Sequence, residues 1–136
     1  MRSWLRAGLV VAVVAGGVGA ALAQNGLTKE DRRGTVTVTV TLAAPPVDVT
    51  PIRVTVVLDT HSAVLDAIKF EEVVAMRSPE GIDIKPTVVA EKGGVHHREA
   101  VLVFPPIAQS GTVRIVVRNV GGIAERVFSW SCPTLC

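Results

Sequence analysis

Apolar and polar residues alternate in several short segments of the chain, and these segments predict β-strands. The clearest is residues 35–42, TVTVTVTL, in which valine or leucine occupies every second position and threonine the positions between. A period of two places the apolar side chains on one face of a strand and the threonines on the other. β-branched residues dominate this segment, which also favours a strand. Further strands are predicted at 52–58, 82–89, 100–104, 113–118 and 123–130.

Turn-forming residues separate the predicted strands, and no long helix is expected between them. Prolines end strands at 45–46 and 105–106, SPEG reverses the chain at 78–81, and NVGG at 119–122 is typical of a hairpin turn. Residues 62–76 leave three alternatives open, namely a crossing segment, a short strand or a single helical turn. Six or seven strands with this spacing predict an all-β fold, an antiparallel two-sheet sandwich of immunoglobulin-like or cupredoxin-like type.

The N-terminal residues do not follow the strand pattern. A basic start, an apolar run and the small residues ALA before Gln24 predict a secretory signal peptide over residues 1–23. The apolar run is short for a membrane span, although retention of the segment as an anchor is the alternative. Residues 24–34, QNGLTKEDRRG, are polar and unpatterned, so we expect a flexible arm before a domain at 35–131. The chain is therefore expected to be periplasmic or extracellular, with no membrane span after cleavage.

The charge balance argues against a nucleic-acid partner. The chain has 14 Lys and Arg against 12 Asp and Glu, but Arg2 and Arg6 lie in the predicted signal. Without them the net charge is zero with neutral histidines. The high isoelectric point is therefore due to the predicted signal, and it does not indicate a basic surface for nucleic acid.

Candidate metal ligands gather at one end of the predicted sandwich. Asp59 and His61 follow the strand at 52–58, and His96 and His97 lie in a loop after two glycines. If consecutive strands alternate in direction, these residues and the 119–122 turn fall at the same end. Imidazole and carboxylate groups are ligands that suit copper or zinc. We therefore predict a copper or zinc site at this end, in which one of the adjacent histidines joins His61 and Asp59 orients an imidazole.

A structural role for the same residues is the alternative. The Asp59 side chain would satisfy N–H groups of its loop, while His61 would pack over the sheet. Arg98 or Arg126 would neutralise Asp59. Arg126 falls in step with the inward-facing aromatic residues of its strand, so it is expected to need a buried carboxylate partner. Asp59 and Arg126 would then belong to a structural polar core.

The two cysteines, Cys132 and Cys136, form a second candidate site in the tail 132–136. In an exported protein a disulfide is the simplest expectation. The Cys-x-x-x-Cys spacing resembles the copper sites of Sco-type copper-delivery proteins and of cytochrome oxidase subunit II, which implies Cu(I) binding by two thiolates. A redox-active thiol pair and a link to another chain also remain open. Strand direction places this tail at the end opposite the histidines.

The sequence shows no catalytic signature. It lacks a Gly-x-Ser-x-Gly elbow, and neighbouring residues on one strand cannot form a Ser-His-Asp relay. The patches DTHS (59–62), GGVHHR (93–98) and ERVFSW (125–130) resemble small exported bacterial β-sandwich proteins of unassigned function. We therefore expect an exported, non-catalytic binding module with a metal site at the histidines. The alternative is a purely structural domain that contacts another envelope protein, with a C-terminal disulfide and no ligand.

Overall fold

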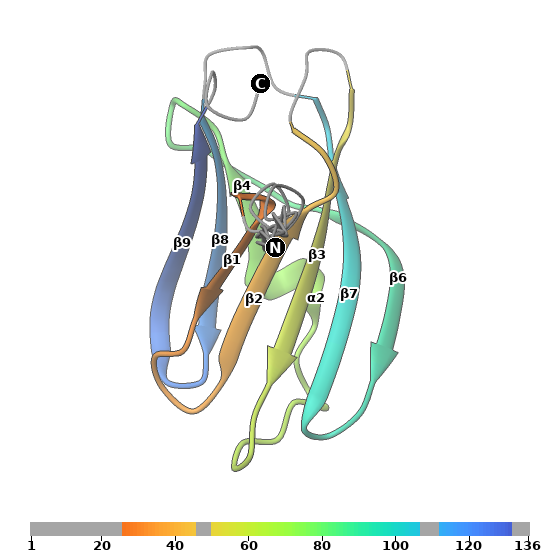
Figure 1. Ribbon diagram of the computed structural model, residues 1–136, viewed down its shortest axis with the longest axis vertical. Coiled ribbons are helices and arrows are strands. Elements are labelled where there is room, and N and C mark those ends of the chain that lie inside the picture. The colour runs from red at the N-terminus through yellow and green to blue at the C-terminus, as the bar shows by residue number, and fades with distance from the viewer. Residues whose placement is uncertain (1–25, 46–49, 107–111, 132–136) are drawn as a thin grey trace, which may run out of the picture.

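Two antiparallel β-sheets pack face to face in the computed structural model, which describes residues 26–45, 50–106 and 112–131 (Figure 1). The larger sheet contains, in spatial order, β1 (Thr28–Asp31), β2 (Thr37–Leu42), β3 (Ile52–Asp59), β7 (His97–Phe104) and β6 (Thr87–Gly93). The smaller sheet contains, in spatial order, β5 (Asp83–Ile84), β4 (Val74–Arg77), β8 (Thr112–Val120) and β9 (Ile123–Ser131). A single helical turn, α2 (Phe70–Val73), leads into β4. The predicted all-β, two-sheet sandwich is confirmed.

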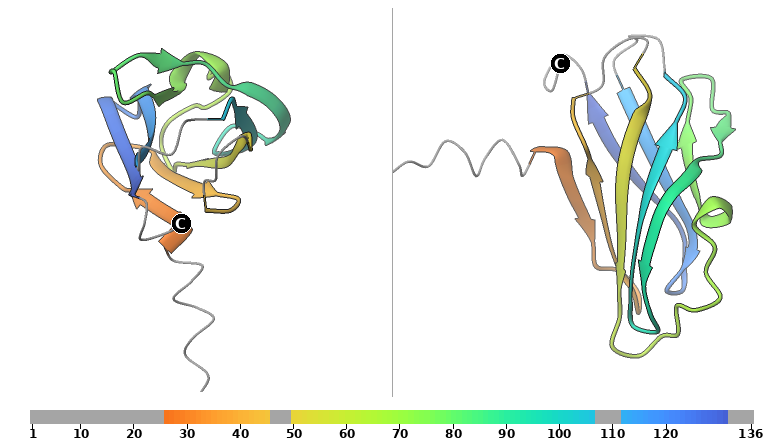
Figure 2. Two further views of the ribbon diagram at one scale, coloured as in Figure 1. Left: turned by 90° about the horizontal axis from the view of Figure 1, so that it is seen from above. Right: turned by 90° about the vertical axis from the view of Figure 1, so that its right-hand side faces the viewer.

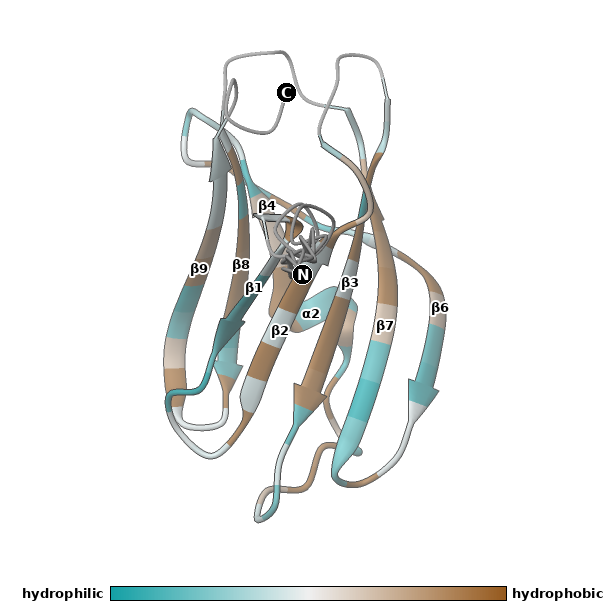
Figure 3. Cartoon of the chain, viewed as in Figure 1, coloured by the Kyte–Doolittle hydropathy of each residue, from teal (hydrophilic) through white to brown (hydrophobic). Residues whose placement is uncertain are grey.

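The alternating apolar residues form the core between the sheets. On β2, Val38, Val40 and Leu42 are buried, whereas the threonines between them are half-buried on the outer face. The core continues through the inward-facing residues of β3, β7, β8 and β9, including Trp130. Figure 3 shows that hydrophobic residues recur along β2, β3, β7, β8 and β9. Each fully buried valine or leucine contributes on the order of 1.5–3 kcal/mol of hydrophobic stabilisation. The alternation of apolar and polar residues therefore determines which side chains of each strand lie in the core.

Strand β1 departs from the prediction of a flexible arm at residues 24–34. Its four residues pair antiparallel with β2, with Thr28 opposite Thr41 and Asp31 opposite Val38. This strand has no apolar period because its inward positions carry charged groups. Lys29 Nζ lies 5.7 Å from the centre of the Trp130 ring, and Asp31 contacts a buried arginine. Polar contacts to β9 therefore hold β1 at the edge of the larger sheet.

The described residues contain nine strands, more than the six or seven expected. The extra strands are β1, the short β4 and the split of the segment at 82–89 into β5 and β6. The ambiguous segment at 62–76 becomes a loop followed by α2 and the first residues of β4. The hairpin predicted around 119–122 is present as β8 and β9, with Val120 paired to Ile123. In the described part of the chain, no helix has the length and apolar character needed to cross a membrane.

Four connections meet at one end of the sandwich, which we call the histidine end: residues 32–36, 60–69, 94–96 and 121–122 (lower end in Figure 1). The side view in Figure 2 shows that this end lies on the long axis of an elongated molecule. Backbone hydrogen bonds join the connections, from Thr35 N to Gly121 O (3.0 Å), from Thr60 N to His96 O (3.0 Å) and from Leu65 N to Val95 O (3.0 Å). The loops therefore support one another.

Candidate functional site

Pairing of the two central strands brings Asp59 and His97 together at the histidine end. Asp59 is the last residue of β3 and lies directly opposite His97, the first residue of β7. His97 Nδ1 lies 2.5 Å from Asp59 Oδ1, and about half of each side chain is exposed. An ionised carboxylate only accepts hydrogen bonds, so Nδ1 carries the proton. This hydrogen bond leaves Nε2 as the ring nitrogen that has no hydrogen-bond partner among the described residues.

The neighbouring His96 is held by a different acceptor. Its Nδ1 lies 3.2 Å from the carbonyl oxygen of Ala63, in the 60–69 connection. A carbonyl oxygen can only accept, so Nδ1 is again the donor and Nε2 the free nitrogen. His96 is exposed. The adjacent histidines thus have their Nδ1 atoms bound to separate oxygens, and the Nε2 atom of each remains available.

Gly93 and Gly94 decide where the two histidines lie. Gly93 has φ +113°, and a Cβ atom at this position would lie only 2.1 Å from His97 O. Gly94 N donates to the same carbonyl oxygen at 2.7 Å. This tight turn requires a residue without a side chain at position 93. Because the turn closes on His97, β7 begins there and His96 remains in the connection.

Thr60 organises the start of the 60–69 connection. Its hydroxyl donates to Thr35 O at 2.7 Å and accepts from Ser62 N at 3.2 Å and Ala63 N at 3.0 Å. The structural alternative assigned this loop-capping role to Asp59. The structure corrects this assignment, because the Asp59 side chain contacts His97 and the Thr60 hydroxyl caps the loop. The sequence signal was present, since threonine hydroxyls commonly bind N–H groups two or three residues later.

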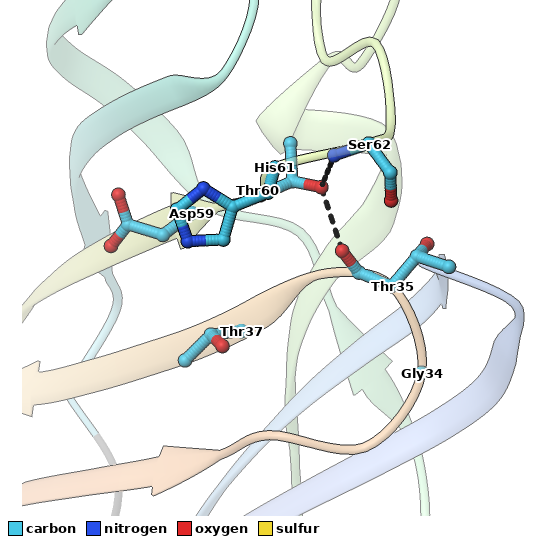
Figure 4. Close-up of a pocket in the computed structure, with 7 residues that line it drawn as sticks. All are labelled: Gly34, Thr35, Thr37, Asp59, Thr60, His61 and Ser62. Atoms are coloured by element: carbon cyan, nitrogen blue, oxygen red, sulfur yellow. Dashed lines mark hydrogen bonds between the residues drawn. The ribbon is translucent and has the colours of Figure 1, made fainter.

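His61 lies beside an open groove rather than packed over the sheet. The groove is lined by Gly34, Thr35, Thr37, Asp59, Thr60, His61 and Ser62 (Figure 4). In Figure 4 the imidazole of His61 extends along the groove toward the Asp59 side chain. His61 is exposed, which differs from the packed position of the structural alternative. The groove surface is rich in hydroxyl groups and contains one carboxylate.

The predicted ligands do not form a closed metal centre within one chain. In the part of the chain that the structure describes, no group of three or more His, Cys, Asp or Glu residues is arranged to hold a metal ion. Asp59 contacts His97, while His96 turns to Ala63 instead. The tail with Cys132 and Cys136 lies outside the described residues. Copper or zinc binding therefore remains a prediction, and these histidines would form an open site.

Arg98 does not neutralise Asp59, because alternation along β7 directs it away from His97. Its guanidinium donates to Leu65 O at 2.7 Å and to Ile68 O, and it pairs with Glu91. It also lies 5.1 Å from the centre of the Phe70 ring. Through these contacts Arg98 holds the 60–69 connection in place. This contact stabilises the loop that holds His96.

Arg126 has a carboxylate partner, but the partner is Asp31 and not Asp59. The Arg126 side chain is completely buried, with Nη1 at 3.2 Å from Asp31 Oδ1 and Nη2 at 3.0 Å from Val120 O. A hydrogen bond from the Arg33 side chain is the main cause that holds the pKa of Asp31 at about 2, and the Arg126 charge adds to it. Burial lowers the pKa of Arg126. The polar core therefore joins β9 to β1.

A ring of four charged residues on the outer face of the smaller sheet was not predicted. Arg77 and Arg118 alternate with Asp83 and Glu125, and each arginine contacts both carboxylates. Hydrogen bonds from Arg77 are the main cause that lowers the pKa of Asp83 and of Glu125. The hairpin register, which pairs Arg118 with Glu125, was accessible from the sequence. The other two members were not, because β4 was left open among three alternatives and the predicted strand at 82–89 was not expected to split into β5 and β6.

Comparisons of the chain with protein-family models, with curated proteins and with solved structures found no match. The resemblance of three sequence patches to small exported β-sandwich proteins therefore stays a prediction.

Proposed function

We propose that the protein is an exported, non-catalytic β-sandwich module that binds a transition metal ion, copper or zinc, at its histidine end. The observation that carries this proposal is the hydrogen bond between His97 Nδ1 and Asp59 Oδ1. It leaves Nε2 of His97 as an exposed lone-pair donor. Metal-binding histidines typically have this arrangement, in which a carboxylate fixes the tautomer and raises the basicity of the ligand.

The placement of the pair also favours ion binding. His97 and Asp59 stand at facing ends of the two central strands, whose inward residues are buried, so the imidazole is attached to a rigid part of the fold. His61 lines the same groove as Asp59. Rigid attachment lowers the cost of ordering a ligand when the ion binds.

The small number of protein ligands indicates what kind of site this is. Structural zinc sites generally have four protein ligands, whereas open sites leave positions for water or for another molecule. A site based on His97 with one nearby histidine belongs to the open type. The predicted signal at residues 1–23 supports a role outside the cytoplasm.

Metal titration of the chain that begins at residue 24 tests the proposal. Cys132→Ser and Cys136→Ser are included throughout, so that tail thiolates do not contribute. Zn(II) and Cu(II) binding is measured by calorimetry for this protein, for His97→Ala and for Asp59→Asn. We expect an affinity tighter than about 10 μM, which corresponds to about 7 kcal/mol. His97→Ala should abolish this binding, and Asp59→Asn should weaken it by about 10–100-fold through loss of the orienting carboxylate.

The control is Glu80→Gln, an exposed residue in the turn at 78–81. It removes one negative charge, as Asp59→Asn does, but far from the histidines, so its affinity should match that of the parent protein. The nitrogen NMR shifts of the chain's three histidines report the tautomer directly in the absence of metal. Equal affinities for Asp59→Asn and the control, or an Nε2-protonated His97, would contradict the proposal.

A further inference from the structure

Strand β9 is an edge strand that has a partner strand on one side only. It pairs with β8 in the smaller sheet. On its other side lies β1, an edge strand of the larger sheet (Figures 1 and 2). Within the described residues, no backbone hydrogen bond joins β9 to β1, and the two strands meet through side chains. An edge strand keeps a row of N–H and C=O groups that can pair with another extended segment.

The other edge strands are less suited to such pairing. β5 has two residues and β1 has four. β6 has seven, but its register shifts between Val88 and Ala90, and it carries Lys92. Bulges, lysines and short length are features that keep edge strands from pairing. β9 has nine residues in one continuous register with β8, contains neither lysine nor proline, and has its inward-facing charge, Arg126, neutralised by Asp31. It is therefore the least protected edge.

A groove runs along this edge of β9. Residues 127–129 of β9 form one wall, and residues 29–33, in and after β1, form the other. Val127, the middle residue of β9, lies on the outer face of its sheet and is 46% exposed. A segment lying in the groove therefore meets the backbone and Val127 of β9 on one side and the side chains of residues 29–33 on the other.

The charges at the groove favour an acidic segment. The wall at 29–33 carries three basic side chains and two carboxylates. One of these carboxylates, Asp31, is shared by Arg33 and the buried Arg126. Four cations are thus balanced by two carboxylates. The Arg32 side chain is 80% exposed, so it can reach a ligand in the groove. A surface with excess positive charge selects a partner that carries carboxylates.

We propose that this groove binds an extended, acidic segment of a partner protein, which adds to the free side of β9 as a further strand of the smaller sheet. Backbone hydrogen bonds to β9 provide affinity. Successive side chains of a strand point to opposite faces, so a segment of alternating apolar and acidic residues packs against Val127 on one face and pairs with Arg32 and Arg33 on the other. This binding does not depend on a metal ion at the histidine end.

Fluorescence anisotropy with a labelled peptide of about eight alternating valine and glutamate residues tests the inference, since this length spans most of β9. The protein again starts at residue 24 and carries Cys132→Ser and Cys136→Ser, and chelator is present throughout. A peptide with lysine in place of glutamate is the control, and it should bind at least about tenfold more weakly because like charges meet in the groove.

Two protein variants test the two walls of the groove. Val127→Glu should weaken binding of the acidic peptide at least about tenfold, because it removes an apolar contact and adds a like charge. Val89→Glu is the matched control, since Val89 is 48% exposed on β6, and it should bind like the parent. Arg32→Gln should weaken binding about two- to fivefold, as expected for an exposed charge pair. This exposed substitution keeps the test decisive if Val127→Glu does not fold.

Hydrogen exchange of the backbone amides identifies the edge that is used. The acidic peptide should slow exchange in β9 and leave exchange in β6 unchanged, because only paired N–H groups become protected. Protection confined to β6 overturns the inference, as does equal binding of the two peptides. Absence of binding by the acidic peptide at about 1 mM, an affinity weaker than about 4 kcal/mol, also overturns it. None of these outcomes bears on metal binding at the histidine end.

Discussion

Replacement of Asp31 by asparagine is expected to destabilise the sandwich, because it leaves the buried Arg126 guanidinium without its counter-charge. Arg126 is completely buried, and the Asp31 side chain is only 13% exposed. Arg126 keeps two backbone acceptors, Asp31 O at 3.1 Å and Val120 O at 3.0 Å. Its Nε atom has no hydrogen-bond partner within the described residues. The carboxylate is thus the main compensation for a positive charge placed between the sheets.

The magnitude follows from the pKa of Asp31. This pKa is about 2, against an ordinary value of 3.8, first because Arg33 donates to the carboxylate and also because Arg126 is positively charged. The difference corresponds to about 2 kcal/mol of stability. A carboxyl group with a lowered pKa stabilises the folded state at pH values above its unfolded pKa. This contribution is therefore complete above about pH 5 and is lost as the pH falls from about 4 toward 2.

Urea unfolding followed by the fluorescence of Trp130 measures the effect. Trp130 is the one tryptophan after residue 23, and it is buried. At pH 7, Asp31→Asn should lower the unfolding free energy by about 2–3 kcal/mol. This is less than the full cost of breaking a buried ion pair, because Arg126 keeps its two backbone carbonyl acceptors. At pH 2.5, which is still slightly above the folded pKa of Asp31, the difference between variant and parent should shrink to about 1 kcal/mol. Glu30→Gln, on the opposite face of β1 and paired with the exposed Arg32, is the control and should change stability by less than about 0.5 kcal/mol. Equal stability of the two variants at pH 7 would refute the role of Asp31.

Two further predictions concern the turn that supports the histidine end and the charged ring. Gly34→Ala should cost at least about 2 kcal/mol, because Gly34 has φ +73° and a Cβ there would lie 2.1 Å from Gly121 O. Gly81→Ala, with φ +83° and open space around the Cβ, should cost only about 1 kcal/mol, and thermal unfolding distinguishes the two. Asp83→Asn should lower the unfolding free energy by about 1 kcal/mol or less, because its ion pair with Arg118 is partly exposed. In about 0.5 M salt, where charges are screened over a few ångströms, this cost should become smaller still. A cost for Asp83→Asn that is independent of salt would show that packing, not charge, holds β5.

The sequence predicted the sandwich because the period of two needs no knowledge of distant residues. Every strand with buried valine or leucine at alternate positions was found, including β2 and β3. Strand β1 was missed because its sequence, TKED, is polar throughout and its partners lie far along the chain. Asp31 meets Arg126 across 95 residues of sequence. A buried arginine in a strand indicated that a carboxylate was needed, but nothing local identified which one.

The location of the candidate site could be predicted from the sequence, but not its detailed geometry. Alternating strand directions placed Asp59 and the histidines at one end, which agrees with the pairing of Asp59 and His97. The choice between His96 and His97 depended on register, because a shift of one residue moves every side chain to the opposite face. The turn at Gly93 sets that register, and its φ of +113° is not visible in the sequence. The capping role of Thr60, by contrast, is local, since its hydroxyl accepts from N–H groups two and three residues later.

The buried arginine and the histidine end belong to one continuous hydrogen-bonded arrangement. Arg126 donates to the carbonyl group of the last residue of β8, which leads into the turn of the hairpin. The oxygen of Gly121 in that turn accepts from Thr35 N, Thr35 O accepts from the Thr60 hydroxyl, and Thr60 N donates to His96 O. Each link joins a different connection, so the position of the His96 backbone depends on contacts that begin at the core. The backbone position of a candidate ligand at an exposed tip therefore depends on buried polar groups, through hydrogen bonds that link the connections of the histidine end.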